Sequence, residues 1–270
     1  MSDFFDYRVK LTKLGPVRFV GHLDVMRYMQ KAVRRAGLPI RYSEGYSPHQ
    51  IMAFALPLSV GATSGGEYMD ISLVSQVSPD EIVASLNRVM HEGITAIACM
   101  RLPEHYTGAM TVIAAASYDI TIREPVVMRL FGGEEKDLPL ARTSCKIALG
   151  DFFAQEKILT VKKTKKGEQQ IDLKPLIHRY EILEDGTARL LLHAGSKDHV
   201  KPSLLFGEFF KARGYEMTPA DLMIHRSDLF TEEEYEGGTR YVPLIADTDD
   251  TAATGGQQTG RGETDGGIFR

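Results

Sequence analysis

Apolar positions in the first 105 residues alternate between the two-residue period of strands and the 3.6-residue period of helices. Four segments are predicted as strands: residues 7–14, 51–56, 67–73 and 94–101. Helices are predicted at residues 23–36 and after Ser78-Pro79-Asp80-Glu81, a capping box with proline at the first helical position. The resulting order, β-α-β-β-α-β, is typical of a ferredoxin-like unit.

The second part of the chain has a similar plan. Strands are predicted at residues 116–123, 158–161, 170–173, 180–183, 189–193 and near 222–225, and helices at 145–155 and 204–213. We therefore predict an α+β fold of two tandem ferredoxin-like (βαββαβ) units with antiparallel sheets. The two domains are expected at residues 1–105 and 110–230.

The composition changes after residue 230. Residues 231–270 contain nine acidic and three basic side chains and are rich in glycine, so we predict a disordered acidic tail. The chain of 270 residues has a net charge of −4. Without the −6 of this tail, the rest of the chain is near +2, and its basic residues are clustered.

Basic and aromatic side chains concentrate between residues 18 and 49. On the predicted helix the basic residues lie opposite the apolar stripe, and a loop with two tyrosines follows. Basic side chains can hold phosphates while tyrosines stack on unpaired bases. A helix face that only meets water would also carry charges, so this alternative stays open. The candidate nucleic-acid-binding residues here are Arg18, Arg27, Lys31, Arg34, Arg35, Arg41, Tyr42, Tyr46 and His49.

A second basic cluster lies at a predicted hairpin tip and consists of Lys162, Lys163, Lys165 and Lys166. These lysines are candidates for binding the phosphates of a nucleic acid. Lysines on an edge hairpin also prevent strand-to-strand aggregation, which is the competing explanation.

His22 is the candidate catalytic residue because it lies where the first strand leads into the helix. It could act as a general base on a ribose hydroxyl or bond a phosphate. The alternative is a histidine that satisfies local backbone groups. The histidines have no compact metal-binding spacing, so no metal site is expected.

Two stretches, Arg18-Phe-Val-Gly-His-Leu-Asp24 and Tyr42-Ser-Glu-Gly-Tyr-Ser-Pro-His49, carry a family resemblance. With residues 54–61 and 67–71, they are similar to an uncharacterised bacterial radical-SAM-associated domain family. Its members occur beside, or fused behind, radical-SAM proteins that often bind cobalamin. The resemblance implies a radical-SAM partner and a genetic setting near RNA-processing and ribosomal genes. It implies no catalytic residues.

Cofactor expectations follow from the cysteines. Cys99 and Cys145 are too few for an iron–sulfur cluster, which usually needs about three or four thiolates. We expect no cofactor in this chain; the partner would carry the iron–sulfur cluster, S-adenosylmethionine and cobalamin. The first residues do not resemble a signal peptide and residues 51–60 are too short to span a membrane, so a cytoplasmic protein is expected.

The leading hypothesis is an accessory protein without activity of its own. It would bind an RNA, either tRNA or rRNA, or would present a substrate, which a radical-SAM enzyme then modifies or processes. One alternative is a metal-independent RNA endonuclease-like enzyme that uses His22. The other is a domain that only docks a radical-SAM protein.

Overall fold

A computed structural model describes residues 4–133, 137–164, 167–195 and 198–246. Within these residues the chain has a mixed α+β fold with six α-helices and one large, mostly antiparallel sheet of nine strands. A separate two-stranded hairpin completes the strands.

The first part of the sheet contains residues 5–101. Its elements are β1 (Phe5–Lys13), the 3-10 turn η1 (Gly15–Phe19), α1 (His22–Arg35), β2 (Met52–Phe54), β3 (Thr63–Leu73), α2 (Pro79–Val89) and β4 (Ile94–Arg101). The strands lie in the order β4-β1-β3, with β2 against the far end of β3. Both helices cover one face, because the alternate residues Tyr7, Val9 and Leu11 of β1 are buried in the core with α1 and α2.

The second part contains residues 109–243, with the strands in the order β10-β5-β9-β8. Its helices are α3 (Ala109–Val112), α4 (Glu124–Phe131), α5 (Leu138–Ala154) and α6 (Pro202–Lys211), with 3-10 turns η2 (Lys174–Leu176) and η3 (Pro219–Asp221). Its strands are β5 (Ile113–Ile122), β6 (Leu159–Thr164), β7 (Gly167–Asp172), β8 (Ile177–Ile182), β9 (Ala188–His193), β10 (Leu222–Tyr235) and β11 (Gly238–Pro243). Phenylalanines of α5 and α6 dominate this core.

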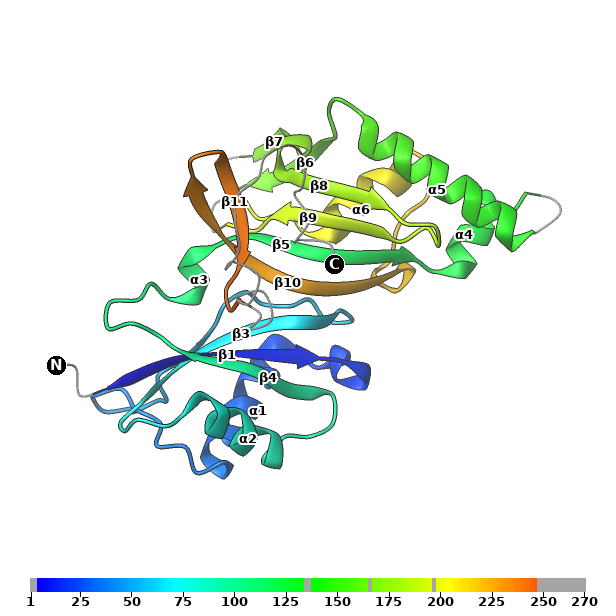
Figure 1. Cartoon of the computed structure of the whole chain (residues 1–270). Coiled ribbons are helices and arrows are strands. Elements are labelled where there is room, and N and C mark those ends of the chain that lie inside the picture. Colours follow the sequence, from blue (N-terminus) through cyan, green and yellow to red (C-terminus); the bar gives the residue numbers. More distant parts are fainter. Residues whose placement is uncertain (1–3, 134–136, 165–166, 196–197, 247–270) are drawn as a thin grey trace, which may run out of the picture.

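The two parts share one sheet because β10 pairs in parallel with the start of β3 (Figure 1). The paired residues are His225 with Thr63 and Arg226 with Ser64. Just beyond, Gly66 lies so close to β10 that a Cβ atom would be 2.5 Å from Asp228 Oδ1 and 2.9 Å from the Ser227 carbonyl oxygen. Any side chain at Gly66 would push the strands apart.

The sequence predicted α1 and α2 and most strands, but it missed α4 and began α5 too late. Helix α5 starts at Leu138, with Asp137 as its N-cap: the Asp137 carboxylate accepts a hydrogen bond at 3.0 Å from the Leu140 amide. The predicted helix began only at residue 145. No described helix is long and apolar enough to cross a membrane.

The prediction of disorder from residue 231 is wrong for residues 231–246. Strand β10 continues to Tyr235 and pairs with β11, and Leu244 and Ile245 are buried in the main core. The prediction averaged the composition over residues 231–270, which are acidic overall. It therefore missed the short apolar segment at residues 241–245, which completes the hairpin. The rest of the predicted tail, residues 247–270, lies outside the described residues.

Replacing Leu244 by Ala should lower the free energy of unfolding by about 2–4 kcal/mol, because it leaves a cavity in the core. Denaturant unfolding monitored by circular dichroism measures this loss. Thr239→Ala, at an exposed position of β11, is the control and should change stability by less than about 0.5 kcal/mol. Equal stability of both variants and the wild type would show that residues 244–245 do not contribute to the core.

Candidate functional site

Helix α1 exposes basic side chains because its apolar residues recur on one face. Val25, Met29, Ala32 and Val33 are buried, and the helix ends before Gly37, which has a φ of +69°. The opposite face exposes Arg27, Lys31, Arg34 and Arg35. The periodicity of the sequence predicted this face correctly.

Little negative charge offsets this face. Asp24 lies 3.5 Å from Arg27, and both side chains are more than 60% exposed, so the pair contributes little. Arg35 donates to the Val89 carbonyl at 3.2 Å. Among the described residues, no ion pair involves Lys31 or Arg34.

The loop at residues 41–49 is held beside α1. Gln50 is buried, and its side-chain amide donates to the Gln30 carbonyl of α1 at 3.1 Å. Tyr42 and Tyr46 are exposed, and Tyr46 is fully accessible to solvent. The loop is closed across its base by His49, whose Nδ1 lies 2.8 Å from Ser43 Oγ. The exposed tyrosines and the basic helix face therefore belong to one surface, which we call the α1–loop surface: Arg27, Lys31, Arg34, Arg35, Tyr42, Tyr46 and His49.

The other predicted binding residues are not counted in this surface. Arg18 is in η1, and the guanidinium of Arg41 stacks on Phe4 at 3.6 Å from the ring centroid. In the hairpin, Lys162 and Lys163 belong to β6, whereas Lys165 and Lys166 lie outside the described residues. Figure 1 shows β6 and β7 at the end of the molecule opposite α1. The described part of this hairpin therefore does not lie beside α1.

His22 is the first residue of α1 and is half-buried. Its ring packs edge-on against Phe54, with 5.5 Å between centroids, and no hydrogen bond to the ring is present among the described residues. Burial lowers the pKa of His22; the charge of Glu67 opposes this effect and that of Arg226 adds to it. The cavity that His22 lines with Lys13 and Glu67 has a volume of about 20 Å³. Such a cavity holds about one water molecule and no ribose.

Lys13 fixes the backbone that leads into α1. Its side chain is buried, and its ammonium donates to the carbonyl oxygen of Val20 at 2.9 Å and of Arg18 at 3.4 Å. Burial lowers the pKa of this lysine. The Arg18 carbonyl also accepts from the Gly61 amide at 2.8 Å, so the segment before α1 is tied to the segment before β3.

Buried charges join β10 to the first part of the sheet. Arg226 is 1% exposed, and its guanidinium donates to both carboxylate oxygens of Glu67 at 2.5–3.0 Å and to the Leu56 carbonyl at 2.8 Å. Asp228 accepts from Lys10 at 2.7 Å and from the Tyr68 hydroxyl at 2.6 Å. Sequence reasoning missed these contacts because their partners are about 160 to 220 positions apart.

The strand pattern contained a partial signal for these contacts. Arg8 and Lys10 alternate with buried apolar residues in β1, and such positions usually meet water. Here they are buried, and Arg8 forms a two-bond pair with Asp70 at 2.7 and 3.0 Å. In the described part of the chain, no three His, Cys, Asp or Glu side chains are grouped closely enough to hold a metal ion.

Comparison with known proteins places most of the chain in one family. Residues 6–202 match the sequence model of a family described as uncharacterised proteins conserved in bacteria (DUF2344). No functionally curated protein matches the sequence. Among solved structures, one described as a "putative glycine cleavage system transcriptional repressor" is 12% identical. The match covers 89% of this chain and 98% of that one, with a TM-score of 0.20, which is too low to support an argument.

Glu67→Gln should destabilise the protein by about 3–5 kcal/mol, because it leaves the Arg226 charge buried without its counter-ion. Adding Arg226→Met should restore much of this loss. Chemical denaturation measures both effects, with Glu233→Gln in the exposed Arg240 pair as a control that costs about 0–1 kcal/mol. A Glu67→Gln effect no larger than that of the control would show that the buried pair is not structurally important.

The His22 ring should titrate below its ordinary pKa of about 6.5. Between the lowered folded pKa and the unfolded value, the unfolded chain binds more protons, so His22 lowers stability as the pH falls through that window. Titration of the His22 ring proton by NMR measures the midpoint. A midpoint at or above the ordinary value would mean that Glu67, rather than burial, dominates its environment.

Proposed function

We propose, from the exposed surface of the protein, that it is an accessory protein that binds RNA for a radical-SAM enzyme. The chain belongs to a family of uncharacterised proteins conserved in bacteria, and the family does not define a function. On this proposal the protein holds tRNA or rRNA, or presents a substrate, while the partner modifies or processes it. The partner part of the proposal rests on the resemblance of residues 18–24 and 42–49 to radical-SAM-associated domains. The RNA part rests on the α1–loop surface.

The observation that carries the RNA proposal is the position of the exposed tyrosines beside an unneutralised basic helix face. Lys31 and Arg34 are exposed and form no ion pair among the described residues, so their charges are available to phosphates. The hydrogen bond from Gln50 to Gln30 fixes the base of the loop that carries Tyr42 and Tyr46 to α1. A basic surface next to exposed aromatic rings is typical of proteins that bind single-stranded RNA.

The surroundings of His22 favour a binding role over catalysis. The small cavity beside His22 does not accommodate a ribose, and its ring packs against Phe54. A general base must reach the proton it removes, directly or through one water molecule. We therefore propose a protein without activity of its own and keep the endonuclease-like reading, with His22 as base, as the alternative to be tested. A domain that only docks a radical-SAM protein is the third reading.

We propose that the reactive cofactors belong to the partner. The two cysteines are on separate elements, Cys99 on β4 and Cys145 on α5. Burial raises the pKa of Cys99 to about 12 and that of Cys145 to about 11, which disfavours the thiolate form that binds metals. We therefore assign an iron–sulfur cluster to the radical-SAM chain. The family resemblance implies that this partner also carries S-adenosylmethionine and cobalamin, and we propose that both chains work in the cytoplasm.

We also infer that each part of the sheet is a ferredoxin-like unit. The strand orders β4-β1-β3-β2 and β10-β5-β9-β8 support this inference, because each places the first and third strands of its unit in the centre. On this interpretation β10, an edge strand of the second unit, pairs with the start of β3, which the short β2 does not reach, and the units do not act as separate modules.

Reversing the charges of Arg27, Lys31 and Arg34 to Glu should weaken RNA binding steeply and reduce its dependence on salt. On a single strand, each lost phosphate contact lowers the salt slope by about 0.7. Fluorescence anisotropy with single-stranded RNA at several salt concentrations measures both quantities. The matched control reverses three exposed basic residues of the second part, Lys201, Lys211 and Arg240. Equal weakening in both triple variants would argue against a specific α1–loop surface.

Tyr46→Ala should cost about 1–3 kcal/mol of binding free energy if the ring stacks on a base, with little change in salt slope. Tyr235→Ala, which removes an exposed tyrosine of β10, is the control.

The His22→Ala variant distinguishes the accessory protein from the nuclease when RNA is incubated with each protein and its length is measured. RNA that stays intact with both wild type and variant fits the accessory protein, whereas cleavage by wild type alone fits the nuclease. If wild type binds no RNA at low salt, the docking-only reading remains.

A further inference from the structure

A cavity of about 410 Å³ lies where the two parts of the sheet meet. The first part contributes Arg18 from η1 and Thr63 from β3. The second part contributes Arg123, which follows β5, together with Arg189 of β9 and His225 of β10. Three arginines thus line one cavity, and no residue of the α1–loop surface does.

Two of these arginines, Arg18 and Arg123, form no ion pair among the described residues, although the guanidinium of Arg18 stacks on Phe19 at 4.8 Å from the ring centroid. Arg189 forms an ion pair with Asp119 at 2.9 Å, so its charge is compensated. By contrast, the Nε atoms of Arg18 and Arg123 are buried and have no hydrogen-bond partner among the described residues. Since these Nε atoms are closed to solvent, an anion in the cavity would meet the other N–H groups of the two guanidiniums, whose charges no ion pair compensates among the described residues.

The other polar groups of the cavity have hydrogen-bond partners, although the Asp185 carboxylate keeps a negative charge that no ion pair compensates among the described residues. Asp185 accepts a hydrogen bond from the Thr187 amide at 2.9 Å, and the Thr121 and Thr187 hydroxyls lie 2.9 Å apart. Nδ1 of His225 lies 2.9 Å from the Thr63 hydroxyl. The guanidinium groups of Arg18 and Arg123 are therefore the groups best placed to recognise a ligand.

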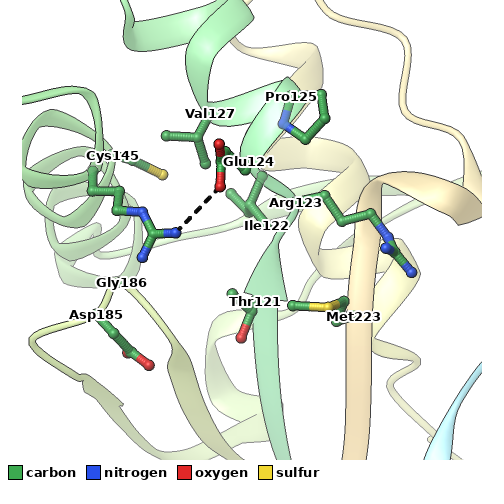
Figure 2. Close-up of a pocket in the computed structure, with 11 residues that line it drawn as sticks. Thr121, Ile122, Arg123, Glu124, Pro125, Val127, Cys145, Asp185, Gly186 and Met223 are labelled. Atoms are coloured by element: carbon green, nitrogen blue, oxygen red, sulfur yellow. Dashed lines mark ion pairs between the residues drawn. The ribbon is translucent and has the colours of Figure 1, made fainter. Parts of the chain in front are cut away.

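A second cavity, of about 310 Å³, adjoins the first and shares Thr121, Arg123, Asp185 and Met223 with it. Figure 2 shows that Arg123 points away from the Glu124–Arg142 ion pair of this second cavity. The walls of the second cavity include Ile122, Val127 and Met223, which suit an apolar or planar group.

We propose that the paired cavities bind a small organic phosphate, of the size of a mononucleotide. Its phosphate lies between Arg18 and Arg123, and its organic body extends into the second cavity. Two guanidinium groups match a doubly charged phosphate better than a singly charged carboxylate. Cavities of about 300–1,000 Å³ are usual for ligands of this size. Since Arg18 comes from the first part and Arg123 from the second, the ligand links the two parts of the sheet.

The test uses inorganic phosphate and adenosine 5′-monophosphate as probes, with calorimetry in a low-salt, phosphate-free buffer. Wild type should bind both probes saturably, and the nucleotide more tightly because it also fills the second cavity. Arg18→Gln and Arg123→Gln should each lower the affinity for both probes by about tenfold or more, as expected when a charged hydrogen bond is lost. Arg240→Gln removes one positive charge outside both cavities and should leave binding unchanged.

The thermal midpoint of each variant without ligand serves as the folding control. Neither Arg18 nor Arg123 forms an ion pair among the described residues, so both variants should fold. No binding of either probe to wild type, or equal weakening by Arg240→Gln, would overturn the proposal. Displacement of the nucleotide by single-stranded RNA would assign the cavity to RNA and overturn it too. Failure of RNA binding with retained nucleotide binding would leave this site standing and contradict only the accessory RNA role.

Discussion

The large sheet depends on a short parallel contact between β3 and β10. Only His225–Thr63 and Arg226–Ser64 are in register there, and the paired residues are about 160 positions apart in the chain. Bringing the ends of so long a segment together costs conformational entropy, and the hydrogen bonds of two residue pairs offset this cost only in part. The adjacent buried contact of Arg226 with Glu67 holds the strands in this register, because breaking it would leave a charge without a partner in the interior.

This contact also positions the groups to which we assign functions. The segment before α1 is bonded through Arg18 to Gly61, two residues before β3 begins. Lys13 holds the same segment from the other side. Arg18 is thereby placed at the cavity that it shares with Arg123, while α1 presents its basic face to solvent. A single backbone segment thus connects the proposed phosphate site with the proposed RNA surface.

Local patterns in the sequence were sufficient for some of these features. The three- and four-residue steps between Met26, Met29, Val33 and Ala36 predicted both α1 and its exposed basic face, because helix periodicity determines which side is buried. The hairpin of β10 and β11 was missed, since its apolar residues were averaged into an acidic segment. The Arg226–Glu67 pair and the cavity between Arg18 and Arg123 depend on tertiary contacts that no local pattern contains.

We propose that RNA binds to the α1–loop surface. Ultraviolet cross-linking of the full chain to single-stranded RNA, followed by mass spectrometry of the linked peptides, locates the contact directly. We expect the linked peptides to contain Tyr42 or Tyr46, because cross-links form where exposed aromatic rings stack on bases. Cross-links confined to the β6–β7 hairpin, or none at low salt, would contradict this proposal.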